Sequence, residues 1–242
     1  MNTIKFPDKK SCLMIAHMGV SGLEPNNSIP AYIAAGNRTY YGIETDLRVT
    51  ADGNFIVIHD SNTLKLTGQD FVVADTNYNV LRSLALIDTK MPKLSQNPAL
   101  VLPSLEEYIY ICKKYNKKCI LELKGEFTHE NLVNLVDRIQ DTSYLENVVF
   151  ITFSLEQIAY LRQMLPTQNM QYLVWDYSPD ILKNLNQYSV DLDINIRNLT
   201  QEQIDEIHAS GHRINVWTCD DIKKAEELVG WGIDFITTNI LE

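Results

Sequence analysis

Short apolar runs alternate with longer amphipathic stretches along most of this chain of 242 residues. Eight runs have the length and composition of buried strands, and each but the last is followed by a stretch with helical periodicity. The strand-like runs are residues 13–17, 41–49, 119–124, 148–154, 171–176, 190–194, 213–218 and 235–238. The helical stretches are residues 28–38, 104–115, 130–139, 156–164, 179–188, 201–209 and 221–229.

This alternation predicts an α/β fold with a parallel sheet, because a crossover helix joins consecutive parallel strands. Eight repeats in a chain of this length predict a (β/α)₈ TIM barrel formed by a single domain, residues 1–242. The alternative is an open doubly wound sheet, but no Gly-rich phosphate-binding turn follows the first strand. No helical stretch follows the last strand-like run.

One segment interrupts the repeat. Asp52-Gly53 is a strong hairpin signal, and residues 55–59 read as the returning strand. Residues 61–103 are polar, lack clear periodicity and end in Pro-rich sequence. We therefore expect a small insertion at 61–103, after the second barrel strand.

Composition excludes several classes of function. The net charge is −10 and the acidic residues are spread along the chain, which argues against a nucleic-acid partner. No run approaches the ~20 apolar residues of a membrane span, and the first residues do not read as a signal peptide. The four cysteines have no metal-ligand spacing and read as reduced core thiols. We expect a cytoplasmic protein with no stable membrane anchor; the oligomeric state is left open.

Glu44 and Asp46 stand one residue apart in the second strand-like run. Strand side chains alternate, so both carboxylates point to the same face. Two anions ~4–6 Å apart repel by a few kcal/mol at an effective dielectric of ~20. A surface edge strand would tolerate the pair, but the inner face of a barrel requires a cation, a proton or a charged substrate.

The next strand-like run carries Glu122 and Lys124 at the same spacing. Glu122 supplies a third carboxylate for the same site. Three carboxylates without a nearby cysteine favour a hard divalent cation, Mg²⁺ or Ca²⁺. Lys124 could pair with Glu122, or serve as a point charge for a phosphate.

Polar residues gather where the predicted strands end, which is where barrel enzymes place their chemistry. These residues are His17, Glu44, Asp46, Glu122, Lys124, Ser154, Asp176, Trp217, Thr218 and Asn239, and His59 ends the hairpin at the same rim. His17 and His59 are candidate acid and base groups, since phosphoryl chemistry requires one group to accept a proton and another to donate one. Each histidine taken alone could be structural. Trp217 is either core packing or a wall of the substrate site.

These residues resemble the motifs of the glycerophosphodiester phosphodiesterase family, in order and spacing, over nearly the whole chain. The matching runs are Ile15-Ala16-His17-Met18-Gly19, Pro25-Asn26-Asn27-Ser28, Ile43-Glu44-Thr45-Asp46, Val57-Ile58-His59-Asp60, Leu121-Glu122-Leu123-Lys124, Thr152-Phe153-Ser154 and Asn215-Val216-Trp217-Thr218. The resemblance implies a (β/α)₈ barrel and metal-dependent hydrolysis of a small phosphodiester to an alcohol and glycerol 3-phosphate. It also implies roles for individual residues: His17 and His59 as the acid/base pair, Glu44, Asp46 and Glu122 as ligands of a divalent cation, and Lys124 as a phosphate contact.

Three positions depart from the family pattern. Met18 stands where the family usually has an arginine, which places an apolar side chain beside the substrate. Asn26 replaces a glutamate near the metal, and Asn239 replaces a common aspartate. Two alternatives follow: a barrel that binds phosphoesters without turnover, and a related phosphodiesterase that cleaves lysophospholipids.

Overall fold

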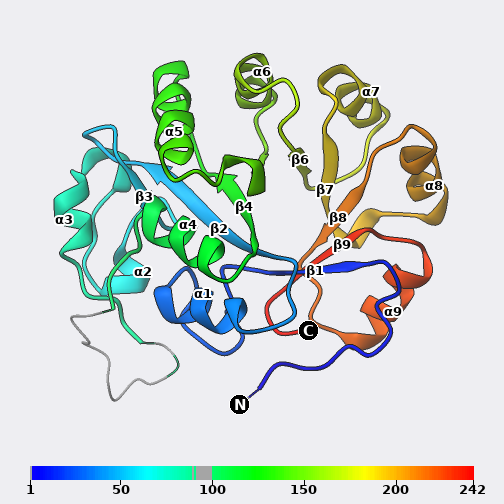
Figure 1. The fold of residues 1–242 in the computed structure, drawn as a ribbon, viewed down its shortest axis with the longest axis horizontal. Coiled ribbons are helices and arrows are strands. Elements are labelled where there is room, and N and C mark those ends of the chain that lie inside the picture. The colour runs from blue at the N-terminus through cyan, green and yellow to red at the C-terminus, as the bar shows by residue number, and fades with distance from the viewer. Residues whose placement is uncertain (1, 89, 91–99) are drawn as a thin grey trace.

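The computed structural model describes residues 2–88, 90 and 100–242, so part of the predicted insertion lies outside the described residues. Eight parallel strands close into a barrel, which confirms the predicted fold class (Figure 1). In barrel order they are β1 (Leu13–Ala16), β9 (Phe235–Thr238), β8 (Ile214–Trp217), β7 (Asp191–Asn195), β6 (Met170–Val174), β5 (Val148–Thr152), β4 (Lys118–Leu123) and β2 (Gly42–Val49). The pairing of β1 with β2 closes the ring.

Helices lie on the outside of the barrel between consecutive strands (Figure 1). They are α1 (Ile29–Gly36), α4 (Leu105–Lys114), α5 (His129–Asp141), α6 (Leu155–Met164), α7 (Pro179–Tyr188), α8 (Gln201–Ala209) and α9 (Ile222–Gly230). Side-chain caps fix several starts: the Ser104 hydroxyl accepts from the backbone N–H of Glu107, whose carboxylate accepts from the Ser104 N–H in return. Local sequence therefore sets where these helices begin.

The short strand β3 (Phe55–Val57) pairs antiparallel with β2 and lies outside the closed ring. The segment that follows contains α2 (Leu64–Thr67), a 3₁₀ turn η1 (Val73–Asp75) and α3 (Tyr78–Arg82), which the sequence did not predict. This segment has its own small core, formed by Ile56, Ile58, Val73, Leu81, Leu84, Leu86, Leu100 and Leu102. The core attaches the segment to the β2–β3 hairpin.

The terminal segments lie side by side where a last helix would otherwise follow β9 (Figure 1). Ile4 pairs with Leu241, and the backbone N–H of Phe6 donates to the Glu242 carbonyl. Phe6 and Leu241 are both buried in the core between the sheet and the helices. These two short segments cover the core beside β9, where the other strands are covered by a helix.

The four cysteines are buried and free, as predicted for core thiols. Burial is also the main reason that the pKa of the Cys12 thiol rises to about 12 and that of Cys219 to about 11. Among the described residues, no helix is both long and apolar enough to cross a membrane.

Candidate active site

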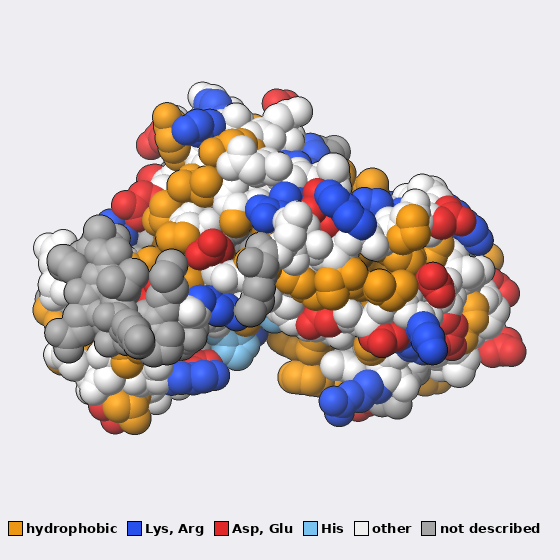
Figure 2. Space-filling view, turned by 90° about the horizontal axis from the view of Figure 1, so that it is seen from below, with side chains coloured by type: hydrophobic (Ala, Val, Ile, Leu, Met, Phe, Trp, Pro, Cys, Tyr) orange, Lys and Arg blue, Asp and Glu red, His pale blue; other side chains and the backbone are white. Residues whose placement is uncertain are grey.

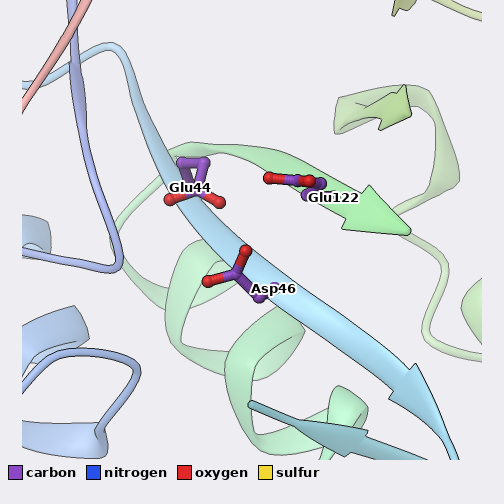
Figure 3. Close-up of side chains that lie close together, drawn as sticks. All are labelled: Glu44, Asp46 and Glu122. Atoms are coloured by element: carbon purple, nitrogen blue, oxygen red, sulfur yellow. The ribbon is translucent and has the colours of Figure 1, made fainter. Parts of the chain in front are cut away.

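Glu44 and Asp46 on β2 and Glu122 on β4 bring their carboxylates together inside the barrel (Figure 3). One oxygen from each lies within 4.8 Å of the others. The strand register explains this, because Asp46 and Glu122 are direct partners across the β2–β4 pair. All three side chains are buried, so the predicted grouping is present in the structure.

This grouping is electrostatically unfavourable without a positive charge. Burial, followed by the negative charges of Asp46 and Glu122, raises the pKa of Glu44 well above its usual value. Burial and the Asp46 charge raise the pKa of Glu122 to about 7. Without an added cation the cluster therefore takes up protons near neutral pH.

Lys124 partly neutralises the three carboxylates. Its ammonium lies 2.8 Å from Glu122 Oε1 and 3.4 Å from Asp46 Oδ1. Burial lowers the pKa of Lys124, but the charges of Asp46 and Glu122 outweigh burial and leave the pKa raised. One ammonium cannot balance three carboxylates, so room for further positive charge remains.

The cluster fits a hard divalent cation. Glu44 Oε1 is buried and has neither a hydrogen bond nor an ion pair in the described part of the chain. A buried carboxylate oxygen without a partner costs ~1–3 kcal/mol or more, which a metal ion would offset. Three oxygen donors within 4.8 Å suit Mg²⁺ or Ca²⁺ better than a soft metal.

The loop after β1 holds two of the carboxylates in place. The backbone N–H of Met18 donates to Glu44 Oε2 at 2.7 Å, and the Asn27 amide donates to Asp46 Oδ2 at 2.7 Å. Asn27 Oδ1 in turn accepts from the Thr45 hydroxyl at 2.9 Å. Asn27 is a site residue that the sequence reasoning missed, although it stands in one of the motifs.

His17 follows β1 and faces the cluster, with its Nε2 4.0 Å from Glu44 Oε2. Its Nδ1 lies 2.7 Å from Asn239 Oδ1, while the Asn239 amide nitrogen donates to Asp220 Oδ2. With the amide oriented in this way, Oδ1 can only accept, so Nδ1 of His17 carries the proton and Nε2 is bare. Burial lowers the pKa of His17, which favours the neutral ring.

His59 reaches the same cavity from the loop after β3. Its Nδ1 lies 2.7 Å from Asp60 Oδ1, and its carbonyl accepts from Arg48 Nε and Nη2 at 2.9 and 2.6 Å. The hydrogen bond from His59 is the main reason that the pKa of Asp60 is lowered. An ionised Asp60 can balance a charged imidazolium at His59, the form that donates a proton.

A cavity of about 340 Å³ opens at the carboxyl ends of the strands. Its lining includes His17, Met18, Glu44, His59, Glu122, Lys124, Phe153, Trp175, Asp193, Trp217 and Thr218. Figure 2 shows a hollowed face where histidine side chains (pale blue) lie beside hydrophobic ones (orange). Asp46 lies close behind this lining, against Lys124.

Two aromatic residues that line the cavity, Phe153 and Trp175, were not predicted from the sequence. Inward-facing positions alternate along β5 and β6, so Ile151 and Leu173 are followed inward by Phe153 and Trp175. Ser154 lies beside Glu122 and Lys124 in a neighbouring pocket, and its hydroxyl also caps α6 by accepting from the Gln157 N–H. Counting the strand period outward from buried positions would have identified the two aromatic residues.

The comparison with known proteins covers the residues of this site. Residues 17–242 match the Glycerophosphoryl diester phosphodiesterase family. This chain belongs to that family. Membership confirms the predicted enzyme class, a glycerophosphodiester phosphodiesterase.

Relatives cover nearly the whole chain. It is 25% identical over 232 residues to a glycerophosphodiester phosphodiesterase of Bacillus altitudinis, covering 93% of this chain and 94% of the relative. It is 26% identical over 250 residues to one from Bacillus subtilis, covering 96% and 84%. The family resemblance seen in the sequence is therefore confirmed.

Solved structures share the fold. A glycerophosphodiester phosphodiesterase of Parabacteroides distasonis matches with a TM-score of 0.78 and 26% identity, covering 99% of this chain and 94% of the other. An Oleispira antarctica phosphodiesterase in complex with the product sn-glycerol-3-phosphate matches with a TM-score of 0.85 and 22% identity, covering 94% and 92%. These matches confirm the barrel.

Proposed function

We propose that this protein hydrolyses glycerophosphodiesters to an alcohol and glycerol 3-phosphate, with a divalent cation held by Glu44, Asp46 and Glu122. The observation that carries the proposal is the buried cluster of three carboxylates, left short of positive charge beside two histidines. A bound cation would supply Lewis-acid stabilisation of the phosphate charge. The relative crystallised with sn-glycerol-3-phosphate supports this product.

The two histidines take different parts in this proposal. His17 Nε2 is bare and its ring neutral, so His17 accepts the proton of the attacking water or glycerol hydroxyl. His59, balanced by Asp60, gives its proton to the departing alcohol oxygen. The P–O bond to the alcohol breaks as the new P–O bond forms; attack by the glycerol hydroxyl gives a cyclic phosphate that water then opens.

Lys124 and the loop after β1 orient the substrate. The Lys124 ammonium, 18% exposed at the cavity, contacts a non-bridging phosphate oxygen. Met18 gives its backbone N–H to Glu44 and places its side chain at the cavity wall. With Met18 where the family usually has an arginine, the cavity has an apolar side chain at this position, and the backbone contact that holds Glu44 is kept.

The test is turnover of glycerophosphoethanolamine with Mg²⁺ or Ca²⁺, and with EDTA. We expect cation-dependent release of glycerol 3-phosphate, and a loss of about 10²–10³-fold in kcat for Glu44→Gln. Glu130→Gln, at an exposed position on α5, is the matched control and should retain full activity.

Equal turnover with EDTA and in Glu44→Gln would overturn the cation site. A phosphoester-binding barrel without turnover would instead bind glycerophosphoethanolamine in calorimetry and release no product. Release of product from lysophosphatidylcholine but not from glycerophosphoethanolamine would establish the lipid alternative.

A further inference from the structure

Three aromatic side chains form one wall of the cavity; we name Phe153, Trp175 and Trp217 the aromatic wall. They follow or end β5, β6 and β8 and lie across the mouth from β1 and β2. The ring centroids are 5.9 Å apart for Phe153–Trp175, 4.8 Å for Trp175–Trp217 and 6.2 Å for Phe153–Trp217. All three rings line the same cavity as Glu44 and Glu122.

Two of the three residues of the aromatic wall are exposed, while Trp217 is partly buried against the inner core. Trp175 is 62% exposed and Phe153 is 38% exposed, while Ile151 and Leu173 beneath them are buried. Each large aromatic side chain offers about 150–250 Å² of surface, and leaving that surface in water forgoes much of the gain from burial. Apolar area held open at the mouth of an active-site cavity points to a ligand that covers it.

The three rings of the aromatic wall contact one another. Their centroid distances of 4.8–6.2 Å are those of ordinary ring–ring contacts. The planes of Phe153 and Trp175 lie within 21° of each other, and Trp217 stands at 87° and 73° to them. The wall therefore presents adjoining ring surfaces to the cavity, which are mostly apolar.

The charges around the cavity disfavour a cationic alcohol. Glu44 and Glu122 are taken by the cation of the proposed function, and Lys124 is itself positive. Asp193 is buried beneath the cavity, where burial raises its pKa well above the usual range. The described lining of the cavity therefore offers no further ionised carboxylate to a positively charged alcohol.

We propose that the aromatic wall binds the alcohol portion of the phosphodiester and selects substrates whose leaving alcohol is uncharged and apolar. This inference rests on the proposed function, since the phosphate must lie at the carboxylate cluster and Lys124 for the alcohol to reach the wall. In the hydrolysis, water adds to phosphorus, the P–O bond to the alcohol breaks, and the alcohol leaves with the proton donated by His59. The wall takes no part in these bonds and acts through affinity alone.

The experiment compares three esters of glycerol 3-phosphate that differ only in the alcohol: ethanolamine, choline, and 3,3-dimethylbutanol, the uncharged carbon isostere of choline. The same readout, release of glycerol 3-phosphate, serves all three. We expect kcat/KM for the dimethylbutyl ester to exceed that for the choline ester by about tenfold. We expect Trp175→Ala to lower the ratio of kcat/KM for the dimethylbutyl ester to that for the ethanolamine ester by about tenfold. Phe153→Ala should lower the same ratio by a smaller factor.

Tyr110→Ala is the matched control, because Tyr110 is an aromatic residue 68% exposed on α4 and outside the cavity. It should leave every ratio unchanged. A preference for the choline ester that Trp175→Ala removes would show a cation site and overturn the proposal, as would ratios that neither wall variant alters. No turnover of any of the three esters by the wild-type protein with Mg²⁺ or Ca²⁺ would mean that the proposed function itself fails, an outcome distinct from both.

Discussion

Asp193 shows how one buried side chain links the site to stability. It lies inside the barrel on β7, is 1% exposed, and its Oδ1 has no hydrogen-bond partner among the described residues. Burial, followed by the charge of Glu122, raises its pKa well above the usual range. The folded protein therefore holds a proton that the unfolded chain releases above pH ~4.

Asp193→Asn removes this linkage. We expect the variant to be more stable than the wild-type protein at pH 8, because a raised pKa costs stability as pH rises above the unfolded value. The difference should shrink as pH falls toward 4. Denaturant unfolding in EDTA at several pH values measures it, and a difference independent of pH would contradict the assignment.

Glu122 gives the cation site its own pH dependence. Its pKa is raised to about 7, so a cation must displace a proton from it at and below neutral pH. We expect the affinity for Mg²⁺ or Ca²⁺ to weaken as pH falls from 8 to 6, by up to about tenfold per pH unit for one displaced proton. Calorimetry in buffers of different ionisation enthalpy counts the released protons. Affinity that is constant over this range would show that Glu122 stays out of the site.

Among the elements, the hairpin of β2 and β3 brings one histidine to the cavity from outside the closed ring. Arg48 on β2 donates two hydrogen bonds to the His59 carbonyl, which ties the loop after β3 back to the barrel. Gly125 follows β4 with φ +83°, and a Cβ there would lie 3.2 Å from Arg48 Nη1. The position of His59 therefore depends on Arg48, a side chain that does not line the cavity.

Arg48→Met tests this positioning role. We expect kcat for glycerophosphoethanolamine to fall by about tenfold with little change in KM, since misplaced acid groups slow the chemical step more than binding. Arg48→Lys should restore part of the rate, because an ammonium can still donate to the carbonyl. Arg197→Met, at an exposed position, serves as the control. An equal fall in Arg48→Met and Arg48→Lys, accompanied by a lower unfolding temperature, would indicate a structural role alone.

The strands and helices show how much of the fold could be predicted from the sequence. Period and capping residues located the barrel strands and outer helices to within a few residues, because local rules govern them. The carboxylate cluster was predictable because the period of two fixes the face of Glu44 and Asp46. The helices α2 and α3 were missed, since each is one turn long and held by its small core rather than by its own pattern.

Two residues of the aromatic wall, Phe153 and Trp175, were missed for a different reason, whereas Trp217 was predicted as a possible wall of the substrate site. Attention to polar residues at strand ends selected Ser154 and Asp176, whereas the strand period directs Phe153 and Trp175 inward. The hydrogen bonds of Asn239 to His17 and Asp220 depend on three distant segments and lie beyond any local rule.

At the scale of the whole molecule, Glu242 fastens the two terminal segments together. Its carboxylate accepts from the Thr3 hydroxyl at 2.5 Å and the Thr39 N–H at 2.9 Å, and pairs with Lys5 at 2.9 Å. Burial raises the pKa of Glu242, but these partners outweigh burial and lower it to about 2. The terminal segments are held by charge-assisted contacts as well as by apolar burial.

Glu242→Gln should lower the free energy of unfolding by about 1.5–3 kcal/mol at pH 7, the usual worth of hydrogen bonds to a charged group. A lowered pKa contributes stability that is present above the unfolded value near 4.5 and is lost as pH falls toward 2. The difference between variant and wild type should therefore shrink as pH falls from 4.5 toward 2. Thermal unfolding between pH 7 and pH 2.5 measures this, and a difference at pH 2.5 as large as that at pH 7 would contradict it.

The pairing of Ile4 with Leu241 has a consequence for how the chain can be rearranged. A short peptide could join the present ends, and a new break could be opened at the exposed turn of Gly211, between α8 and β8 and away from the cavity. Such a circular permutant would begin and end at this turn, yet every strand of the barrel would keep its neighbours. We therefore expect the permutant to keep the active-site cavity although the order of its elements along the chain is changed.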